Sequence, residues 1–126
     1  MADDSPVNQK VTLSMLRRMG FAPQVVSNGE EAVEAVMATA FDLVFLDVQM
    51  PVMDGYTAAR TIRQRFASGP RPWLVALTAN ALQGDRELCL EAGMDDYVTK
   101  PVRPKDLEAA IFRASTQTSV ARQQAA

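Results

Sequence analysis

Residues 41–55 read FDLVFLDVQMPVMDG, and this stretch decides the fold. It contains a continuous apolar run, LVFL, that ends directly at Asp47. A short run with no polar alternation is typical of a strand buried on both faces, as in parallel sheets. The turn-forming letters PVMDG follow, and Asp54 is placed to cap a helix over about 56–65. The stretch therefore predicts a strand, a loop and a helix, with Asp47 at the carboxyl end of the strand.

Helices and strands alternate on both sides of this stretch. Before it, we expect a helix from Ser5-Pro6 to Gly20, an extended segment over 23–27 and a helix capped by Asn28. After it, we expect strands at 73–77 and 97–99, helices at about 84–92 and from Pro104, and a polar tail beyond Ala114. Such alternation implies a parallel sheet with helices on both faces, because parallel strands need crossover connections. The expected fold class is α/β, with one domain over 1–114 and a tail over 115–126.

The composition is that of one ordinary globular domain. The chain has 126 residues, 48% of them hydrophobic, and 13 basic against 15 acidic residues give a formal net charge of −2. This balance argues against a nucleic-acid partner, and no apolar run approaches the ~20 residues that span a bilayer. The single cysteine, Cys89, fits a reducing compartment. We therefore expect a soluble, cytoplasmic domain with no direct membrane contact.

Polar residues follow the predicted strands at the point where each ends. They are Asp47, Thr78 and Lys100, and the pair Asp3-Asp4 precedes the first helix. The carboxyl ends of parallel strands meet at one edge, where ligands bind in such sheets. Converging carboxylates need a cation, and oxygen ligands favour a hard ion such as Mg²⁺. Asp47 ends the most buried strand, so it is the best candidate for a nucleophile that forms an aspartyl phosphate.

Each of these residues also has a simpler interpretation. Asp3 and Asp4 could merely cap a helix, Lys100-Pro101 could be a surface turn, and a threonine such as Thr78 is common after a strand. Their combination at the strand ends of one sheet favours a phosphoryl-binding site over these separate roles.

With these residues identified, the chain resembles the receiver domains of two-component response regulators and, more closely, those of hybrid histidine kinases. The resemblance covers about residues 2–114 and rests on DDSPVNQ at 3–9, FDLVFLDVQMPVMDG at 41–55, ALTAN at 76–80 and GMDDYVTKP at 93–101. It implies a flavodoxin-like doubly wound parallel sheet with strand order 2-1-3-4-5.

The resemblance implies a role for each matching position of the site. Asp47 corresponds to the phosphoacceptor, and Thr78 and Lys100 to the hydroxyl and the lysine that contact the phosphoryl group. The expected ligands of a Mg²⁺ cofactor all present oxygen: Asp4 directly, Asp3 through a water, Asp47, and the backbone carbonyl of Gln49.

The resemblance also implies a conformational switch and a partner. Tyr97 corresponds to the aromatic residue that moves with Thr78, and Lys100-Pro101 to a cis peptide bond. The expected readout face comprises the helix over 84–92, the strand over 97–99 and the helix over 104–114. The chain has no histidine, so its phosphate would come from a histidine kinase or a histidine-phosphotransfer protein. We expect a phosphoacceptor and not an enzyme, with any kinase activity in another domain of a parent protein.

The N-terminus departs from the family pattern. Receivers have an apolar strand of about five residues before the acidic pair, and here only Met1 and Ala2 precede Asp3. The first strand is thus nearly absent, although it should lie between the strands around 25–26 and 43–46. Either the second strand shifts, two copies exchange a segment, the region is partly disordered, or the sequence begins downstream of its natural start. We expect a perturbed N-terminal third and possible self-association.

Two other functions are compatible with an aspartate at a strand end. A Mg²⁺-dependent phosphohydrolase would need a second acid two residues after Asp47, where this chain has Gln49, and it would also need room for a substrate cap domain. A degenerate receiver that only binds a partner protein is the other alternative, and the presence of the full phosphorylation set argues against it.

Overall fold

From β1 onward, strands and helices alternate strictly along the chain. The elements of the computed structural model are α1 (Pro6–Arg18), α2 (Gly29–Ala38), β1 (Leu43–Asp47), α3 (Gly55–Arg65), β2 (Trp73–Thr78), α4 (Gln83–Glu91), β3 (Asp96–Thr99) and α5 (Pro104–Ala125). The structure describes all residues except 3–5, 22, 40, 42, 49, 51, 67–71, 79–82, 101 and 126, and it leaves out the side chains of 8, 83–86 and 116–125. The α/β class is confirmed.

The three strands form one parallel sheet in the order β1-β2-β3. Asp47 lies level with Leu77, and Thr78 lies level with Thr99. On the free side of β1, Ala2 makes parallel bridges to both Leu46 and Val26. The named strands therefore match the last three positions of the expected order, and Ala2 lies where the first strand of that order belongs.

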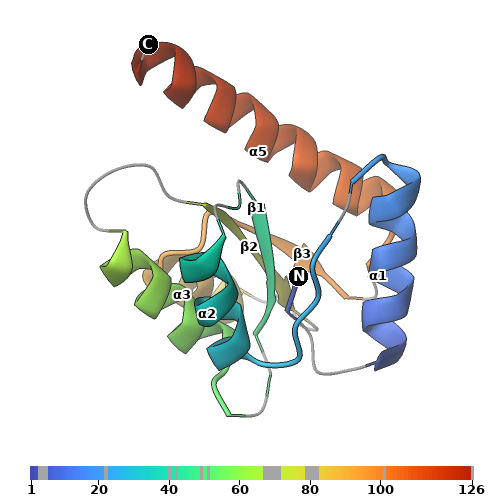
Figure 1. Cartoon of the computed structure of the whole chain (residues 1–126), viewed down its shortest axis with the longest axis horizontal. Coiled ribbons are helices and arrows are strands. Elements are labelled where there is room, and N and C mark those ends of the chain that lie inside the picture. Colours follow the sequence, from blue (N-terminus) through green and yellow to red (C-terminus); the bar gives the residue numbers. More distant parts are fainter. Residues whose placement is uncertain are drawn as a thin grey trace.

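Helices cover both faces of the sheet, with α1 and α5 on one face and α2 and α3 on the other (Figure 1), and Cys89 of α4 packs into the same core as α2 and α3. Each face has its own core. The α2–α3 core contains Ala32, Val36, Val44, Leu46, Ala58, Ile62 and Cys89 among its buried residues. The α1–α5 core contains Leu16, Phe45, Val75, Leu77, Val98, Leu107 and Ala110. Neighbouring residues of β1, such as Val44 and Phe45, enter opposite cores, which explains why the whole strand is apolar.

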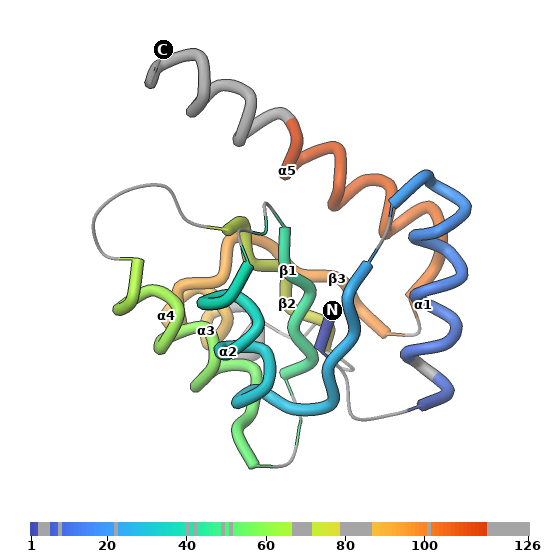
Figure 2. Tube along the Cα trace, viewed as in Figure 1, coloured from blue at the N-terminus to red at the C-terminus, as the bar shows by residue number. Residues whose placement is uncertain are grey.

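Met1 and Ala2 take the place of a first strand. The Ala2 N–H donates to the Phe45 carbonyl at 2.8 Å, and the Asp47 N–H donates to the Ala2 carbonyl at 2.9 Å. On the other side, the Val26 N–H donates to the Met1 carbonyl at 3.0 Å. Figure 2 shows the N-terminus beside β1 and the chain that precedes α2. The expected gap is thus bridged by two residues and continues beyond them as an apolar cavity of about 240 Å³.

Side-chain caps fix the starts of α2 and α3, as the sequence predicts. The Asn28 side chain accepts a 2.9 Å hydrogen bond from the Glu31 N–H. The Asp54 side chain accepts a 2.8 Å hydrogen bond from the Thr57 N–H. These bonds satisfy amide donors that the first turn of a helix leaves without partners, so both predicted helix starts are confirmed.

The last helix is longer than expected. We predicted that it would end near Ala114, with a polar tail beyond, but α5 continues to Ala125. The segment 115–125 contains no proline or glycine to stop a helix, and its alanine, glutamine and arginine residues favour one. Polarity alone was therefore the wrong signal for the helix end. Among the described residues, no helix is long and apolar enough to cross a membrane.

Candidate functional site

Asp47 is a buried carboxylate at the carboxyl end of β1. Its side chain is 5% exposed, and its Oδ2 atom lies 2.5 Å from the Nζ atom of Lys100, whose side chain is 19% exposed. Lys100 follows β3, two strands away from β1, so the parallel sheet is what brings the two charges together. A buried carboxylate stays ionised only with such a partner. The two residues lie at one edge of the sheet, as the sequence analysis expects, and their direct ion pair is an additional finding.

Thr78 lies between these two charges at the end of β2. Thr78 is 2% exposed, and it directly follows Leu77, the residue of β2 that is level with Asp47. The Lys100 N–H donates to the Thr78 carbonyl at 2.7 Å, which ties the end of β3 to the end of β2. The sheet therefore presents a carboxylate, a hydroxyl and an ammonium group along one edge.

The loop after Asp47 is packed tightly against the start of α3. The Gly55 N–H donates to the Val48 carbonyl at 3.2 Å, and a Cβ atom at Gly55 would collide with the Asp47 carbonyl group. Only glycine allows this approach, which holds the backbone of Asp47 in place. Within the same loop Val52 has φ of 67°, a left-handed conformation that is costly for a β-branched residue.

Tyr97 lies on β3, level with Ala76 of β2, and is half-buried against the α2–α3 core. It also lines a groove of about 320 Å³ between β3 and α5, together with Asp96, Asp106 and Arg113. The Nε atom of Arg113 lies 2.5 Å from Oδ2 of Asp96, so an ion pair crosses this groove. On α4, Leu88 is 43% and Leu90 is 55% exposed. The expected readout face thus has both a groove and exposed apolar side chains.

Several predicted site residues lie outside the described residues: Asp3, Asp4, Gln49 and Pro101. Of the expected magnesium ligands, only the Asp47 carboxylate is described, and the described part of the chain holds no cluster of three metal-ligating side chains. The Asp47 side chain fits a magnesium site, since a carboxylate is a ligand that Mg²⁺ accepts. The ligand set and the cis peptide bond remain predictions.

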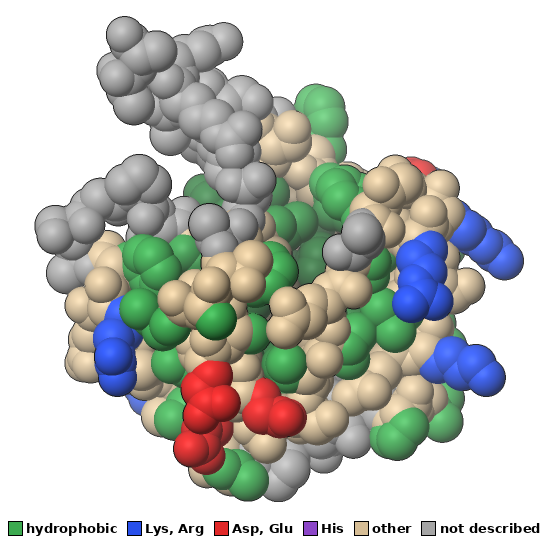
Figure 3. Space-filling model, viewed as in Figure 1, with side chains coloured by type: hydrophobic (Ala, Val, Ile, Leu, Met, Phe, Trp, Pro, Cys, Tyr) green, Lys and Arg blue, Asp and Glu red, His purple; other side chains and the backbone are tan. Residues whose placement is uncertain are grey.

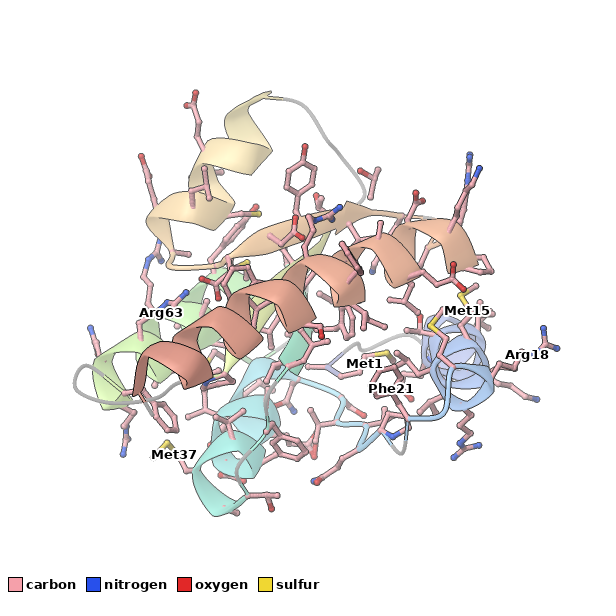
Figure 4. The ribbon with its side chains drawn as sticks, turned by 90° about the horizontal axis from the view of Figure 1, so that it is seen from above. Met1, Met15, Arg18, Phe21, Met37 and Arg63 are labelled. Atoms are coloured by element: carbon pink, nitrogen blue, oxygen red, sulfur yellow. The ribbon has the colours of Figure 1, made fainter. Side chains whose placement is uncertain are left out.

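An ion pair that the sequence analysis did not predict joins α3 to the residue before β3, near the amino end of β2. The Nη2 atom of Arg63 on α3 lies 2.8 Å from Oδ1 of Asp95, and the Asp95 Oδ2 atom accepts a 2.8 Å hydrogen bond from the Leu74 N–H. Arg63 also donates to the Gly93 carbonyl. Figure 4 shows the Arg63 side chain leaving α3 toward this part of the molecule. Since 30 or more residues separate Arg63 from these partners in sequence, only the tertiary structure reveals the contact.

Comparison with known proteins supports the interpretation of this edge. The family model of the response regulator receiver domain matches residues 1–112. The receiver domain of sensor histidine kinase PA1611 from Pseudomonas aeruginosa, solved with magnesium in its active-site cleft, is 45% identical with a TM-score of 0.81, over 89% of this chain and 91% of that one. The receiver of a Saccharomyces cerevisiae response regulator, solved with its histidine phosphotransfer protein, is 34% identical with a TM-score of 0.81, over 85% and 80% of the respective chains.

Similar full-length proteins are much longer than this chain. The sensor protein GacS of Pseudomonas syringae is 42% identical over 113 residues, which cover 88% of this chain and 12% of that protein. Hybrid signal transduction histidine kinase G of Dictyostelium discoideum is 37% identical over 115 residues, or 90% of this chain and 3% of that protein. The chain thus corresponds to a small part of these multidomain kinases.

Proposed function

Since this chain belongs to the response regulator receiver domain family and is a receiver of the two-component phosphorelay type, we propose that Asp47 is its phosphoacceptor. The observation that carries the proposal is the contact of 2.5 Å between the Lys100 ammonium group and the Asp47 carboxylate. A lysine in this place can transfer its contact from the free carboxylate to an oxygen of a phosphoryl group bound to it.

The reaction follows from the chemistry of an aspartate nucleophile. A carboxylate oxygen of Asp47 attacks the phosphorus of a phosphohistidine, the P–N bond breaks, and the imidazole leaves and takes up a proton. The product is an acyl phosphate on Asp47. The Lys100 ammonium group and the Thr78 hydroxyl stabilise the negative charge on the transferring group, because Thr78 ends β2 and Lys100 follows β3 at the same edge of the sheet as Asp47.

Magnesium would be held by the oxygen ligands expected from the sequence, which are Asp3, Asp4, Asp47 and the Gln49 carbonyl. When bound, Mg²⁺ neutralises the charge of the carboxylates and of the incoming phosphoryl oxygens. The relative from Pseudomonas aeruginosa carries magnesium in its active-site cleft, which supports this assignment. Ala2, level with Leu46, ends the described N-terminal segment next to the position of Asp47.

The consequence of phosphorylation would be a change on the β3 side of the sheet. The phosphoryl oxygen would draw Thr78 toward it, and Tyr97 would move with Thr78. The readout face would be α4, β3 and the first turns of α5. The partner would be a histidine kinase or a histidine-phosphotransfer protein, and the yeast complex supports the second kind of partner. The transfer would take place in the cytoplasm, and this chain would supply no enzyme activity of its own.

Mass spectrometry after incubation with a small phosphodonor and Mg²⁺ tests the proposal. The unmodified sequence should gain one phosphoryl group, and Asp47→Asn should gain none, because an amide is not a nucleophile here. Asp54→Asn is the matched control: it makes the same chemical change seven positions away, at the cap of α3, and asparagine also caps helices, so uptake should be normal.

Two outcomes would contradict the assignment. Uptake at the normal rate by Asp47→Asn would place the phosphoacceptor elsewhere. No uptake by the unmodified protein, with a folded state and Mg²⁺ present, would favour a degenerate receiver that only binds a partner.

A further inference from the structure

The loop between Asp47 and α3 is bonded to the first turn of α2. The Gly29 N–H donates to the Met53 carbonyl at 2.9 Å. Gly29 is the first residue of α2, so its amide is one of the donors for which the helix itself has no acceptor. Figure 1 shows the chain that leads into α3 beside the start of α2. A carbonyl of the loop thus satisfies a buried amide at the start of a helix that precedes it in the chain.

The contact leaves no room for a side chain at Gly29. A Cβ atom there would collide with the Met53 carbonyl group and would lie 3.0 Å from the Asp54 carbonyl oxygen. These are backbone atoms, which cannot turn away as the end of a flexible side chain can. Glycine is therefore required at this position if the loop is to keep its place.

The first turn of α2 is stabilised independently of the loop. Besides the Asn28 cap, the Glu31 carboxylate accepts a 2.9 Å hydrogen bond from the Ser27 N–H, an arrangement similar to a capping box. Figure 3 shows acidic side chains gathered over this turn, where Glu30 and Glu31 lie. Negative charge near the N-terminus of a helix is favourable. The start of α2 is thus a fixed support against which the loop rests.

The loop does need such a support. Val52 holds a left-handed backbone conformation that is unfavourable for valine, and such a conformation persists only where the surrounding contacts impose it. One contact is the bond from the Gly55 N–H to the Val48 carbonyl, and a second is the packing of Met50 and Met53 against the α2–α3 core. The bond from α2 to the Met53 carbonyl directly follows the strained residue. It is therefore well placed to hold the loop in its strained form.

We propose that Gly29 is a positioning residue for phosphoryl transfer, whose amide and lack of a side chain hold the loop after Asp47 in the form that binds Mg²⁺. The inference rests on the proposed function, in which this loop supplies the Gln49 carbonyl to the metal. Groups that orient a metal ligand from behind commonly change metal affinity by about 10- to 100-fold. By linkage, bound Mg²⁺ also stabilises the bond between Gly29 and Met53.

Gly29→Ala tests the proposal on the whole chain. The added methyl group displaces the Met53 carbonyl, so we expect the dissociation constant for Mg²⁺, measured by amide NMR titration, to rise about tenfold. Without Mg²⁺, hydrogen exchange of the Gly55 N–H should become at least tenfold faster relative to that of Leu77, a fully buried residue of β2. This ratio reports opening of the loop and not unfolding of the whole domain.

Gly20→Ala is the control for a general loss of stability. Gly20 has φ of 93° and no atom within 4 Å of the position of a Cβ atom, so alanine strains the backbone there without touching the loop. The melting temperature of this variant should fall, whereas its Mg²⁺ affinity and its exchange ratio should stay those of the unmodified chain.

A second pair of variants loosens the support without adding an atom beside the loop. Asn28→Ala removes the acceptor of the Glu31 N–H and should weaken Mg²⁺ binding in the same direction as Gly29→Ala. Asn28→Ser keeps a capping oxygen and should restore the affinity. This pair decides the question if Gly29→Ala does not fold. Equal Mg²⁺ affinities of the alanine and serine variants would then overturn the proposal.

The unmodified chain provides a test that needs no variant. Mg²⁺ should slow hydrogen exchange of the Gly29 N–H at least tenfold, because the metal and the bond stabilise the same form of the loop. The proposal is overturned if the chain binds no Mg²⁺, if exchange at Gly29 does not respond to it, or if Gly29→Ala and Gly20→Ala bind it equally. Failure of the proposed function is distinguishable, since the unmodified chain would then bind Mg²⁺ through the supported loop and still gain no phosphoryl group.

Discussion

The backbone N–H of Lys100 donates a 2.7 Å hydrogen bond to the carbonyl of Thr78, directly beside the buried Asp47 carboxylate. This bond connects the residue proposed to bind the phosphoryl group to the residue proposed to switch. Because a main-chain bond is unaffected by substitution of either side chain, each side chain can be changed while the strand ends stay together.

Replacement of Lys100 by methionine tests what the charge of this side chain contributes to stability and to phosphoryl uptake. Lys100→Met keeps the length of the side chain but leaves the Asp47 carboxylate buried without its cation, so we expect a loss of about 2 kcal/mol in the free energy of unfolding. Phosphoryl uptake should fall at least tenfold, a change of about 1.4 kcal/mol in the barrier. Urea unfolding and mass spectrometry measure the two effects. Lys105→Met, on the exposed first turn of α5, is the control and should change neither.

A double variant distinguishes this explanation from general damage. Adding Asp47→Asn to Lys100→Met removes the buried negative charge that has lost Lys100, and most of the lost stability should return. If the double variant is as unstable as Lys100→Met alone, the lysine contributes through packing and not through its charge.

The Arg63–Asp95 ion pair should be a major contribution to stability. Arg63→Ala removes the partner of a nearly buried carboxylate, whose side chain is 9% exposed, and loses the bond to the Gly93 carbonyl as well. We expect the free energy of unfolding to fall by about 3 kcal/mol. Arg65→Ala, two residues along on the exposed face of α3, should change it by less than about 0.5 kcal/mol. Equal effects in urea unfolding of the two variants would show that the pair contributes little.

The loop after Asp47 contains removable strain. Val52 is 77% exposed and has φ of 67°, so its side chain gains no burial in return for an unfavourable backbone conformation. Val52→Asn should raise the free energy of unfolding by about 1 kcal/mol, because asparagine tolerates the left-handed region. Val7→Asn is the comparison, since Val7 is 71% exposed on a right-handed helix and should gain nothing. Thermal unfolding of the two variants measures the difference, and a stabilised Val7→Asn would point to surface polarity as the cause.

Stability should rise with pH between about 6 and 8 in a chain that begins at Met1. Burial lowers the pKa of the Met1 amino group from 8.0 to about 6, so in this interval the unfolded chain binds the proton and the folded chain does not. Raising the pH therefore favours the folded state, by up to about 2 kcal/mol, and the gain is complete above pH 8. Acetylation of the amino group removes this titration. The free energy of unfolding, measured with urea, should then no longer rise with pH across this range. An unchanged slope after acetylation would assign the pH dependence to another group.

The sequence predicted the helices and strands where a local signal existed. The caps Asn28 and Asp54 marked helix starts, and the apolar run before Asp47 marked a strand buried on both faces, because both signals are short-range. The end of α5 was wrong because a polar helix with few apolar residues resembles a tail by composition. The nearly absent first strand was recognised, but not the way in which Met1 and Ala2 bridge its two neighbours.

The candidate site was predictable to the extent that strand ends converge in any parallel sheet. Asp47, Thr78 and Lys100 lie along one edge for that reason. The Arg63–Asp95 pair was not predictable, since nothing in the local sequence of α3 distinguishes Arg63 from Arg65. The contact forms because Arg63 lies on the side of α3 that faces Gly93, a residue 30 positions further along the chain.

Asp95 and Asp96 are neighbours in the chain but pair with arginines on opposite faces of the sheet, Arg63 of α3 and Arg113 of α5. A slip of β3 by one residue along β2 would turn each carboxylate to the wrong face and break both pairs together. The two ion pairs therefore fix the register of β3 against β2. The movement proposed for the neighbouring Tyr97 side chain would therefore leave the register of β3 unchanged.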